Sequence, residues 1–196
     1  MDRIGKALEI SFERHRWQKR KVNGAPYIVH ILDVAKYLLS EPSVPEDVII
    51  AGILHDTLED TDYRPEELEK EFGESVLDLV RIATEPGHNI KTSREEKKRT
   101  WKSRKQHTID SCSNASSEGM MVLLADKLSN LQSIKESYVA IGESIWEQFN
   151  ASRHDIEWYY RSLRSEFKVK LEDTRMFKIF DKLVVEVFGA YTKNSR

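Results

Sequence analysis

Several features common in other protein classes are scarce in this sequence of 196 residues. It has one cysteine, Cys112, so no disulfide can form within the chain, and a reducing compartment is expected. No apolar run approaches the roughly 20 residues that a membrane-spanning helix needs, and the first residues lack the apolar core of a signal peptide. The sequence therefore predicts a cytoplasmic protein that makes no membrane contact.

An excess of charge of one sign is also missing. The 31 Lys and Arg residues nearly balance 33 Asp and Glu residues, for a formal net charge of −2. This balance argues against the basic surface of a nucleic-acid-binding protein, so no nucleic-acid partner is expected. The charge is uneven, however, because residues 91–107 hold eight Lys/Arg and two Glu, a local charge of +6.

Strand patterns and internal repeats are absent as well, and apolar residues recur at helical spacing almost throughout. The length fits one domain. The sequence thus predicts an all-α fold, a single globular helical bundle. The expected helices cover residues 2–19, 26–39, 45–60, 65–72, 74–84, 93–112, 117–134, 142–149, 152–168 and 173–188. We expect 93–112 to be exposed or partly mobile, because it holds few apolar residues.

What the chain does contain is a cluster of polar groups at the end of an apolar run. His55 and Asp56 follow the run 48–54, and Glu59 and Asp60 come one helical turn later. At about 100° per residue, all four side chains point into one sector of a helix. Because imidazoles and carboxylates are rarely buried unless they are paired or bind a metal, this position favours a metal site.

Two other apolar helices each carry one group of the same kind, His30 and Asp126. Taken alone, a core histidine is more often hydrogen-bonded to the backbone, and a buried aspartate often caps a helix. Three such helices together favour a shared metal site.

The predicted metal ligands are His30, His55, Asp56 and Asp126. This mixed nitrogen and oxygen set suits Mn²⁺, Fe²⁺, Zn²⁺ or Mg²⁺. Such an ion lowers the pKa of bound water and polarises a phosphoryl oxygen, so we expect metal-assisted hydrolysis. Glu59 and Asp60 are the candidates to hold the water, to act as general base, or to bind the metal through that water.

Three segments, in order along the chain, carry a family resemblance. Residues 20–30 (RKVNGAPYIVH), 55–61 (HDTLEDT) and 125–131 (ADKLSNL) resemble motifs of the HD-domain phosphohydrolases, and specifically of the RelA/SpoT-homologue hydrolase domain. The small stand-alone alarmone hydrolases of that family would cover nearly the whole chain. The resemblance implies one HD domain over 1–196, with a metal and catalytic core at 20–131 and C-terminal helices at 132–196 that complete the bundle.

The resemblance also implies roles for single residues. The metal would be an Mn²⁺-type ion on the four ligands above, and Glu59 and Asp60 would activate the water. Arg20 and Lys21 would meet the purine, with the planar Arg20 guanidinium stacking on its face. Asn130 would contact the ribose, and Ser133 would contact the base. The implied reaction removes pyrophosphate from the 3′ position of guanosine tetra- or pentaphosphate.

The segment 85–116 is the part least similar to that family, and its positive charge leaves the substrate open. Lys97, Arg104 and Lys105 are candidates to bind substrate phosphates, although most charge runs are simply solvated helix faces. One alternative is an HD phosphohydrolase acting on another nucleotide, a phosphomonoester or a dinucleotide phosphate. Another is a catalytically silent nucleotide sensor, which would not need Glu59 and Asp60.

Other histidines and the cysteine are set aside. The second His-Asp pair, 154–155, lies near a helix start without paired carboxylates one turn later, and is read as surface. His15, His88 and His107 stand in polar surroundings and are expected to face solvent. Cys112 has no histidine at a telling spacing and is assigned no catalytic role.

Overall fold

The computed structural model describes residues 2–85 and 93–189, and within these ranges the fold is all-α. Its elements are α1 (Arg3–His15), α2 (Ile28–Leu39), α3 (Glu46–Leu54), α4 (Thr57–Asp60), α5 (Pro65–Phe72), α6 (Glu74–Ala83), α7 (Arg94–Arg99), α8 (Trp101–Asn114), α9 (Ser117–Ile141), η1 (Gly142–Gln148), α10 (Arg153–Leu171) and α11 (Arg175–Phe188). The expected fold class is confirmed. None of the described helices is long and apolar enough to cross a membrane.

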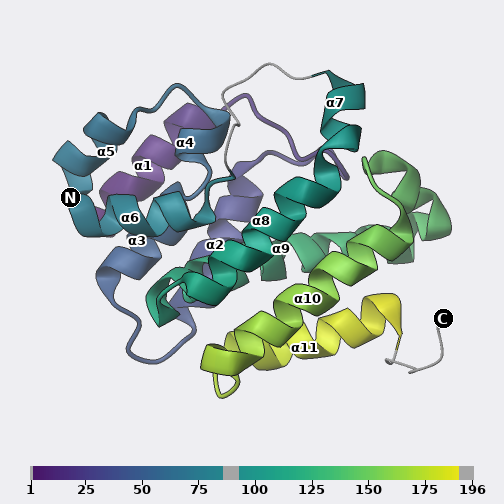
Figure 1. Ribbon diagram of the computed structural model, residues 1–196. Helices are drawn as coiled ribbons and strands as arrows, with labels where there is room; N and C mark the ends of the chain where they lie inside the picture. The colour runs from purple at the N-terminus through teal and green to yellow at the C-terminus, as the bar shows by residue number, and fades with distance from the viewer. Residues whose placement is uncertain (1, 86–92, 190–196) are drawn as a thin grey trace.

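Helix α9 is the centre of the fold (Figure 1). It packs against α2, α3 and α6 on one side, and against α8, α10 and α11 on the other. Helix α3 is buried all round, since every residue from 48 to 54 is inaccessible to solvent or nearly so. The buried helix α3 and the central helix α9 therefore carry several of the polar residues that the sequence singles out.

The close approach of α2 and α3 depends on Gly52. A Cβ atom at this position would lie 2.2 Å from Leu38 Cδ1 and 3.3 Å from Val34 Cγ1. A side chain would therefore push the two helices apart, which overpacked cores resist. Glycine is required here for space rather than for backbone freedom.

Helix α1 is shorter than expected. It ends at His15 and not near residue 19, and Trp17 is exposed. Residues 16–27 instead form a loop that is closed by an isolated β-bridge between Lys19 and Pro26. Gly24 has a φ of +67°, which side-chain-bearing residues rarely adopt, and this lets the loop turn back on itself. The loop carries Arg20 to the site described below.

The third expected helix, 45–60, is broken into two. Helix α3 ends at Leu54, and the four-residue α4 begins at Thr57. The carbonyls left free at the end of α3 are bound locally, because Thr57 Oγ1 donates to Leu54 O at 2.6 Å and His55 Nδ1 lies 2.8 Å from Gly52 O. His55 and Asp56 thus lie in a turn, and Glu59 and Asp60 lie on a separate helix.

The basic segment forms two helices, α7 and α8, which meet at Thr100. Residues 91 and 92 of that segment lie outside the described part of the chain. Helix α8 packs along α10 and buries Thr108, Ile109 and Cys112 (Figure 1). The expected exposure therefore holds for only one side of α8, because its few apolar residues share a face that packs against the fold.

Candidate metal centre

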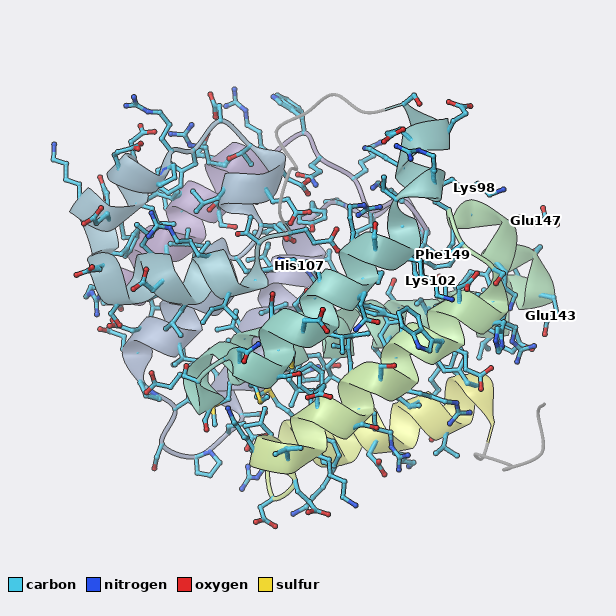
Figure 2. The ribbon with its side chains drawn as sticks, viewed as in Figure 1. Lys98, Lys102, His107, Glu143, Glu147 and Phe149 are labelled. Atoms are coloured by element: carbon cyan, nitrogen blue, oxygen red, sulfur yellow. The ribbon has the colours of Figure 1, made fainter. Side chains whose placement is uncertain are left out.

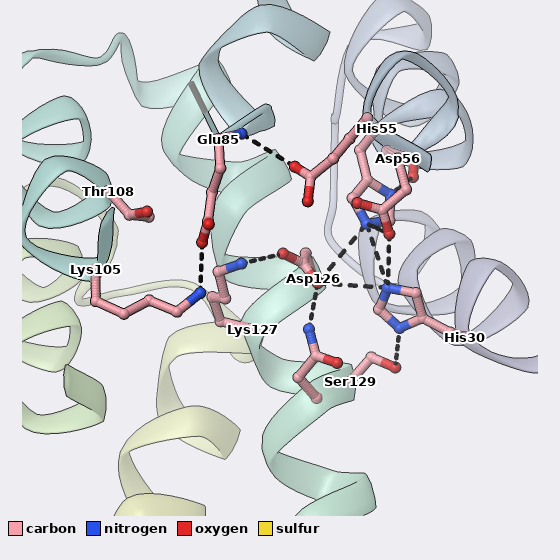
Figure 3. Close-up of polar contacts among 12 residues, drawn as sticks. His30, His55, Asp56, Glu85, Lys105, Thr108, Asp126, Lys127 and Ser129 are labelled. Carbon is pink, nitrogen blue, oxygen red and sulfur yellow. Dashed lines mark hydrogen bonds and ion pairs between the residues drawn. The ribbon is translucent and has the colours of Figure 1, made fainter. Parts of the chain in front are cut away.

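The four predicted ligands converge at one point in the fold (Figure 3). His55 Nε2 lies 2.8 Å from Asp56 Oδ2 and 3.2 Å from His30 Nε2. Asp126 Oδ1 lies 3.4 Å from His30 Nε2 and 3.7 Å from His55 Nε2. Helix α2, the turn between α3 and α4, and helix α9 therefore each supply at least one atom able to bind a metal.

Both histidines are held with Nε2 toward the centre. His55 Nδ1 donates to the carbonyl of Gly52, and His30 Nδ1 lies 2.9 Å from Ser129 Oγ on α9. An imidazole whose Nδ1 carries the proton presents a lone pair on Nε2. Metal-binding histidines commonly have such a partner on the second nitrogen. The Gly52 carbonyl thus fixes the proton of His55 on Nδ1, and the Ser129 hydroxyl can accept the same proton from His30.

The spacing of the four atoms also fits an ion. Neighbouring ligands about 2.1 Å from a metal lie about 3.0 Å apart in an octahedron and about 3.4 Å apart in a tetrahedron. The distances between the histidine nitrogens and the carboxylate oxygens, 2.8 to 3.7 Å, bracket both values. The ligand atoms of His30, His55 and Asp56 thus lie within 4.8 Å of one another, a spacing that suits a divalent metal ion, and Asp126 offers a fourth oxygen next to both histidines.

Asp126 uses its two oxygens differently. Oδ1 faces the histidines and accepts a hydrogen bond from Asn130 Nδ2 at 2.5 Å. Oδ2 accepts from Lys127 Nζ, also at 2.5 Å. With Oδ2 engaged by the lysine, the carboxylate is oriented to offer one oxygen to a metal.

The charges at the centre stabilise one another. Burial opposes ionisation of Asp126, yet Lys127 and the two histidines hold its pKa well below the usual range. Burial also opposes ionisation of Asp56, but the neighbouring His55 imidazole keeps the Asp56 pKa well below its usual value. Burial would discharge Lys127, but Asp126 keeps the lysine pKa well above normal. Both carboxylates are therefore ionised, as metal ligands must be.

One face of the centre opens into a cavity of about 960 Å³. Its walls come from the 18–27 loop, α4, the end of α6, the α7–α8 junction, α9 and residues 148–150. Both water-handling candidates, Glu59 and Asp60, line it. So do six of the seven predicted substrate contacts, namely Arg20, Lys21, Lys97, Arg104, Lys105 and Asn130.

The seventh predicted contact, Ser133, does not reach the cavity. Its hydroxyl is buried within α9 and has no hydrogen-bond partner among the described residues, so the structure does not support a base contact there. Asn130 lines the cavity, but both ends of its amide are engaged. Nδ2 donates to Asp126, and Oδ1 accepts from Arg20 Nη2 at 3.0 Å. Asn130 therefore links a predicted metal ligand to a predicted substrate contact.

Glu85 is a site residue that sequence reasoning missed. It is nearly buried and forms ion pairs with Arg104, at 2.5 Å, and with Lys105. Figure 3 shows the contact with Lys105. Burial opposes its ionisation, but Lys105 and the neighbouring cations lower the Glu85 pKa to about 2. Its backbone N–H also donates to Glu59 Oε2 at 3.0 Å. The available signal was an acidic residue directly after the apolar α6 and before the basic run.

The loop before α2 supplies two more unpredicted partners. Gln18 Nε2 donates to Asp60 Oδ2 at 2.7 Å, and the Tyr27 hydroxyl donates to Asp56 Oδ2. Both side chains line the cavity. Burial and the Asp56 carboxylate raise the Tyr27 pKa far above its usual value, so the phenol keeps its proton and remains a donor.

The remaining histidines fall into two groups. His107 and His154 are exposed, as expected, and Figure 2 shows His107 on the outer side of α8. His88 lies outside the described residues. His15 was expected to face solvent, and this is wrong, because it is only 2% exposed. The α1 helix ends at this residue and packs its ring under Tyr27.

Comparisons with known proteins agree with this geometry. The family model described as the HD domain matches residues 7–157. The Drosophila melanogaster guanosine-3′,5′-bis(diphosphate) 3′-pyrophosphohydrolase MESH1 is 33% identical over 130 residues, which are 65% of this chain and 67% of that protein. An Aquifex aeolicus enzyme of the same activity name is 48% identical over 86 residues, 44% of this chain, but the match spans only 12% of that longer protein.

A solved structure reported for a metazoan ortholog of SpoT that hydrolyses ppGpp superposes with a TM-score of 0.73. The alignment covers 97% of this chain and 98% of that one at 24% identity, a level at which the likeness concerns the fold. The family model covers well over half of the chain, and His30, His55 and Asp56 lie within it in one cluster. The chain therefore belongs to the HD domain family.

Proposed function

We propose that this protein is a metal-dependent guanosine-3′,5′-bis(diphosphate) 3′-pyrophosphohydrolase. The observation that carries the proposal is the position of the His/Asp cluster at the wall of a cavity that also presents many cations. The proposed reaction is the one for which the Drosophila and Aquifex relatives are named. The cluster supplies a reason for metal dependence, and the cavity supplies the room and charge for a polyphosphate.

The charge of the cavity suits a nucleotide with two diphosphate groups. Its lining includes seven Lys and Arg residues, namely Lys19, Arg20, Lys21, Lys97, Arg104, Lys105 and Lys127, next to six Asp and Glu residues, of which Asp56 and Asp126 are proposed metal ligands. Guanidinium and ammonium groups bind phosphoryl oxygens through charge-assisted hydrogen bonds, and arginine can do so with two parallel bonds. The proposed phosphate contacts on α7 and α8 lie on the wall formed by the basic segment, while the ligand set lies on α2, the α3–α4 turn and α9.

A bound divalent ion would polarise a phosphoryl oxygen and lower the pKa of a water molecule. We propose Mn²⁺, held by His30, His55, Asp56 and Asp126, since the mixed nitrogen and oxygen set suits it. The protein's own acid–base groups are Glu59 and Asp60. Each accepts a hydrogen bond on one oxygen, Glu59 from the Glu85 backbone and Asp60 from Gln18, which holds that oxygen in place.

In the proposed reaction, the water oxygen bonds to the phosphorus attached to the ribose 3′ oxygen, and the bond between that phosphorus and the 3′ oxygen breaks. One water proton passes to the Glu59–Asp60 pair, and the 3′ oxygen takes up a proton as it leaves. The products are GDP and pyrophosphate. Arg20 and Lys21 are proposed to hold the nucleoside, and the basic wall is proposed to hold the phosphates.

The test is an assay of the purified protein with Mn²⁺ and guanosine tetraphosphate, next to a panel of other nucleotides, with products resolved by chromatography. Wild type should release GDP and pyrophosphate, and both chelation and Asp126→Ala should abolish this release. Asp60→Asn should keep the metal and lose turnover. Metal loss in Asp60→Asn would show that the ligand assignment is wrong, and failure of wild type to hydrolyse any nucleotide would refute the proposed function.

One observation supports an alternative substrate. Ser133, the residue proposed to contact the base, does not line the cavity, whereas the aromatic rings of Trp101 and Phe149 do. A different nucleotide, either a phosphomonoester or a dinucleotide phosphate, is therefore the alternative. The nucleotide panel separates the two, because preference for guanosine tetraphosphate over the other compounds is expected only from the first.

Two wider proposals follow from the fold. We propose that residues 1–196 form one domain, because α9 packs both on the helices of the 20–131 core and on the C-terminal helices α10 and α11. We also propose a reducing, cytoplasmic location, on the ground that Cys112 is a buried free thiol.

A further inference from the structure

His15 is a buried histidine outside the ligand set. It is the last residue of α1, its Nδ1 lies 2.6 Å from Gln18 Oε1, and its ring stacks on Tyr27 with centroids 5.0 Å apart. Its Nε2 has no hydrogen-bond partner among the described residues. A polar side chain buried in this way costs stability unless it has another role. Through Gln18, His15 is connected to Asp60, one of the two proposed acid–base residues.

The hydrogen bonds from His15 run in one direction. The Asp60 carboxylate only accepts, so the Gln18 amide must present its NH₂ group to Asp60. The amide oxygen of Gln18 therefore faces His15, and because that oxygen also only accepts, His15 Nδ1 must carry the proton. A flipped amide would place one acceptor against the carboxylate and another donor against the Nδ1 proton. Asp60 and His15 thus contact opposite ends of the Gln18 amide, and one orientation of the amide satisfies both contacts.

The same loop is fastened at a second point. The Tyr27 backbone N–H donates to Gln18 O at 3.0 Å, next to the bridge between Lys19 and Pro26. The Tyr27 ring rests on His15, and its hydroxyl donates to Asp56. One imidazole therefore supports two carboxylates by separate routes, Asp60 through a hydrogen-bonded amide and Asp56 through a stacked phenol.

We propose that Gln18, held in register by His15, is a positioning residue for Asp60. With Oδ2 fixed by the amide, Oδ1 is the oxygen that takes the proton from the attacking water. Asp60 lies on the four-residue α4 and is exposed, so its own helix restrains it little. This inference rests on the proposed function, because Gln18 and His15 affect the reaction only if Asp60 accepts the proton of the attacking water. Displacement of a catalytic group by about 1 Å can lower turnover on the order of 100-fold.

The first test compares Gln18→Met with wild type and with Gln106→Met. Gln106 on α8 makes the same amide-to-carboxylate bond, to Asp110 at 2.8 Å, but it lies outside the cavity lining. Gln18→Met should lower kcat for guanosine tetraphosphate roughly 10- to 100-fold with little change in KM. Its Mn²⁺ content and melting temperature should match those of wild type, and Gln106→Met should keep wild-type kcat.

The second test separates hydrogen bonding from packing at His15. His15→Asn keeps an N–H close to the place of Nδ1–H, whereas His15→Phe keeps the stacked ring and loses the donor. A higher kcat in His15→Asn than in His15→Phe supports the proposal, and the reverse order overturns it in favour of packing. Unchanged kcat in Gln18→Met, or a loss matched by equal losses of metal and melting temperature, also overturns it. Absence of turnover by wild type on every nucleotide refutes the proposed function itself, and the positioning role with it.

Discussion

Replacing Glu85 by glutamine should weaken the fold in a way that depends on pH. The Glu85 carboxylate accepts from Arg104 and Lys105, and it is nearly buried. Its pKa falls from an ordinary value of 4.5 to about 2 in the folded chain. Because the folded-state pKa is the lower one, the ion pairs stabilise the fold above about pH 4.5, and this stabilisation is lost as the pH falls toward 2.

The size of the effect follows from the same shift. At about 1.36 kcal/mol per pH unit, the change in the Glu85 pKa corresponds to about 3 kcal/mol at neutral pH. Linkage leaves about 1.5 kcal/mol of this near pH 3. These figures are upper values for Glu85→Gln, since the glutamine oxygen still accepts from one cation and the cations face a solvated cavity.

The assay is urea unfolding of both proteins near pH 7 and near pH 3, with the free energies extrapolated to water. Glu186→Gln serves as the control, because Glu186 pairs with Lys135 at 2.6 Å on the solvent-exposed side of α11. The control should differ little from wild type at either pH. The loss of unfolding free energy in Glu85→Gln should be larger near pH 7 than near pH 3. A loss that is the same at both pH values, or no larger than that of the control, would refute the assignment of Glu85 as a buried, strongly paired carboxylate.

Three further predictions concern packing, reactivity and substrate binding. Gly52→Ala should lower the unfolding free energy by about 1–3 kcal/mol, seen as a lower melting temperature, because the new methyl group would overlap Leu38; an unchanged melting temperature would contradict this. Burial raises the Cys112 pKa to about 12, so a thiol-specific reagent should label the native protein at mildly alkaline pH far more slowly than the urea-unfolded protein. Arg104→Met should raise KM for guanosine tetraphosphate about tenfold or more through loss of a charge-assisted hydrogen bond, and an unchanged KM would mean that this cation only pairs with Glu85.

Most of the helices could be predicted from the sequence, because apolar residues at helical spacing leave few alternatives. The predictions failed at two breaks. Helix α1 stops at His15 although the expected helix ran to residue 19, because Lys19 pairs with Pro26 and closes a loop there. Helix α3 stops at Leu54 because side chains of the next residues bind its last carbonyls. Both causes lie in hydrogen bonds that periodicity does not report.

The residues of the His/Asp cluster could be singled out in the sequence for a related reason. His30 and Asp126 are polar residues on otherwise apolar helices, and such residues stand out in a sequence. Their supporting partners do not. Gln18 lies 42 residues from Asp60, and Glu85 lies 19 residues from Arg104, and each is an ordinary polar residue in its local context. Only the folded arrangement gives these residues a role.

The amide of Asn130 connects Asp126 to Arg20, and this connection should couple the binding of two ligands. One end of it holds Asp126, and the other holds Arg20, so any ligand that orders one of these residues reduces the conformational freedom of the other. The proposed metal ion and the proposed nucleotide should then bind cooperatively. By reciprocity, the factor by which the metal tightens nucleotide binding should equal the factor by which the nucleotide tightens metal binding. In Asn130→Ala the two ligands should bind more independently of each other.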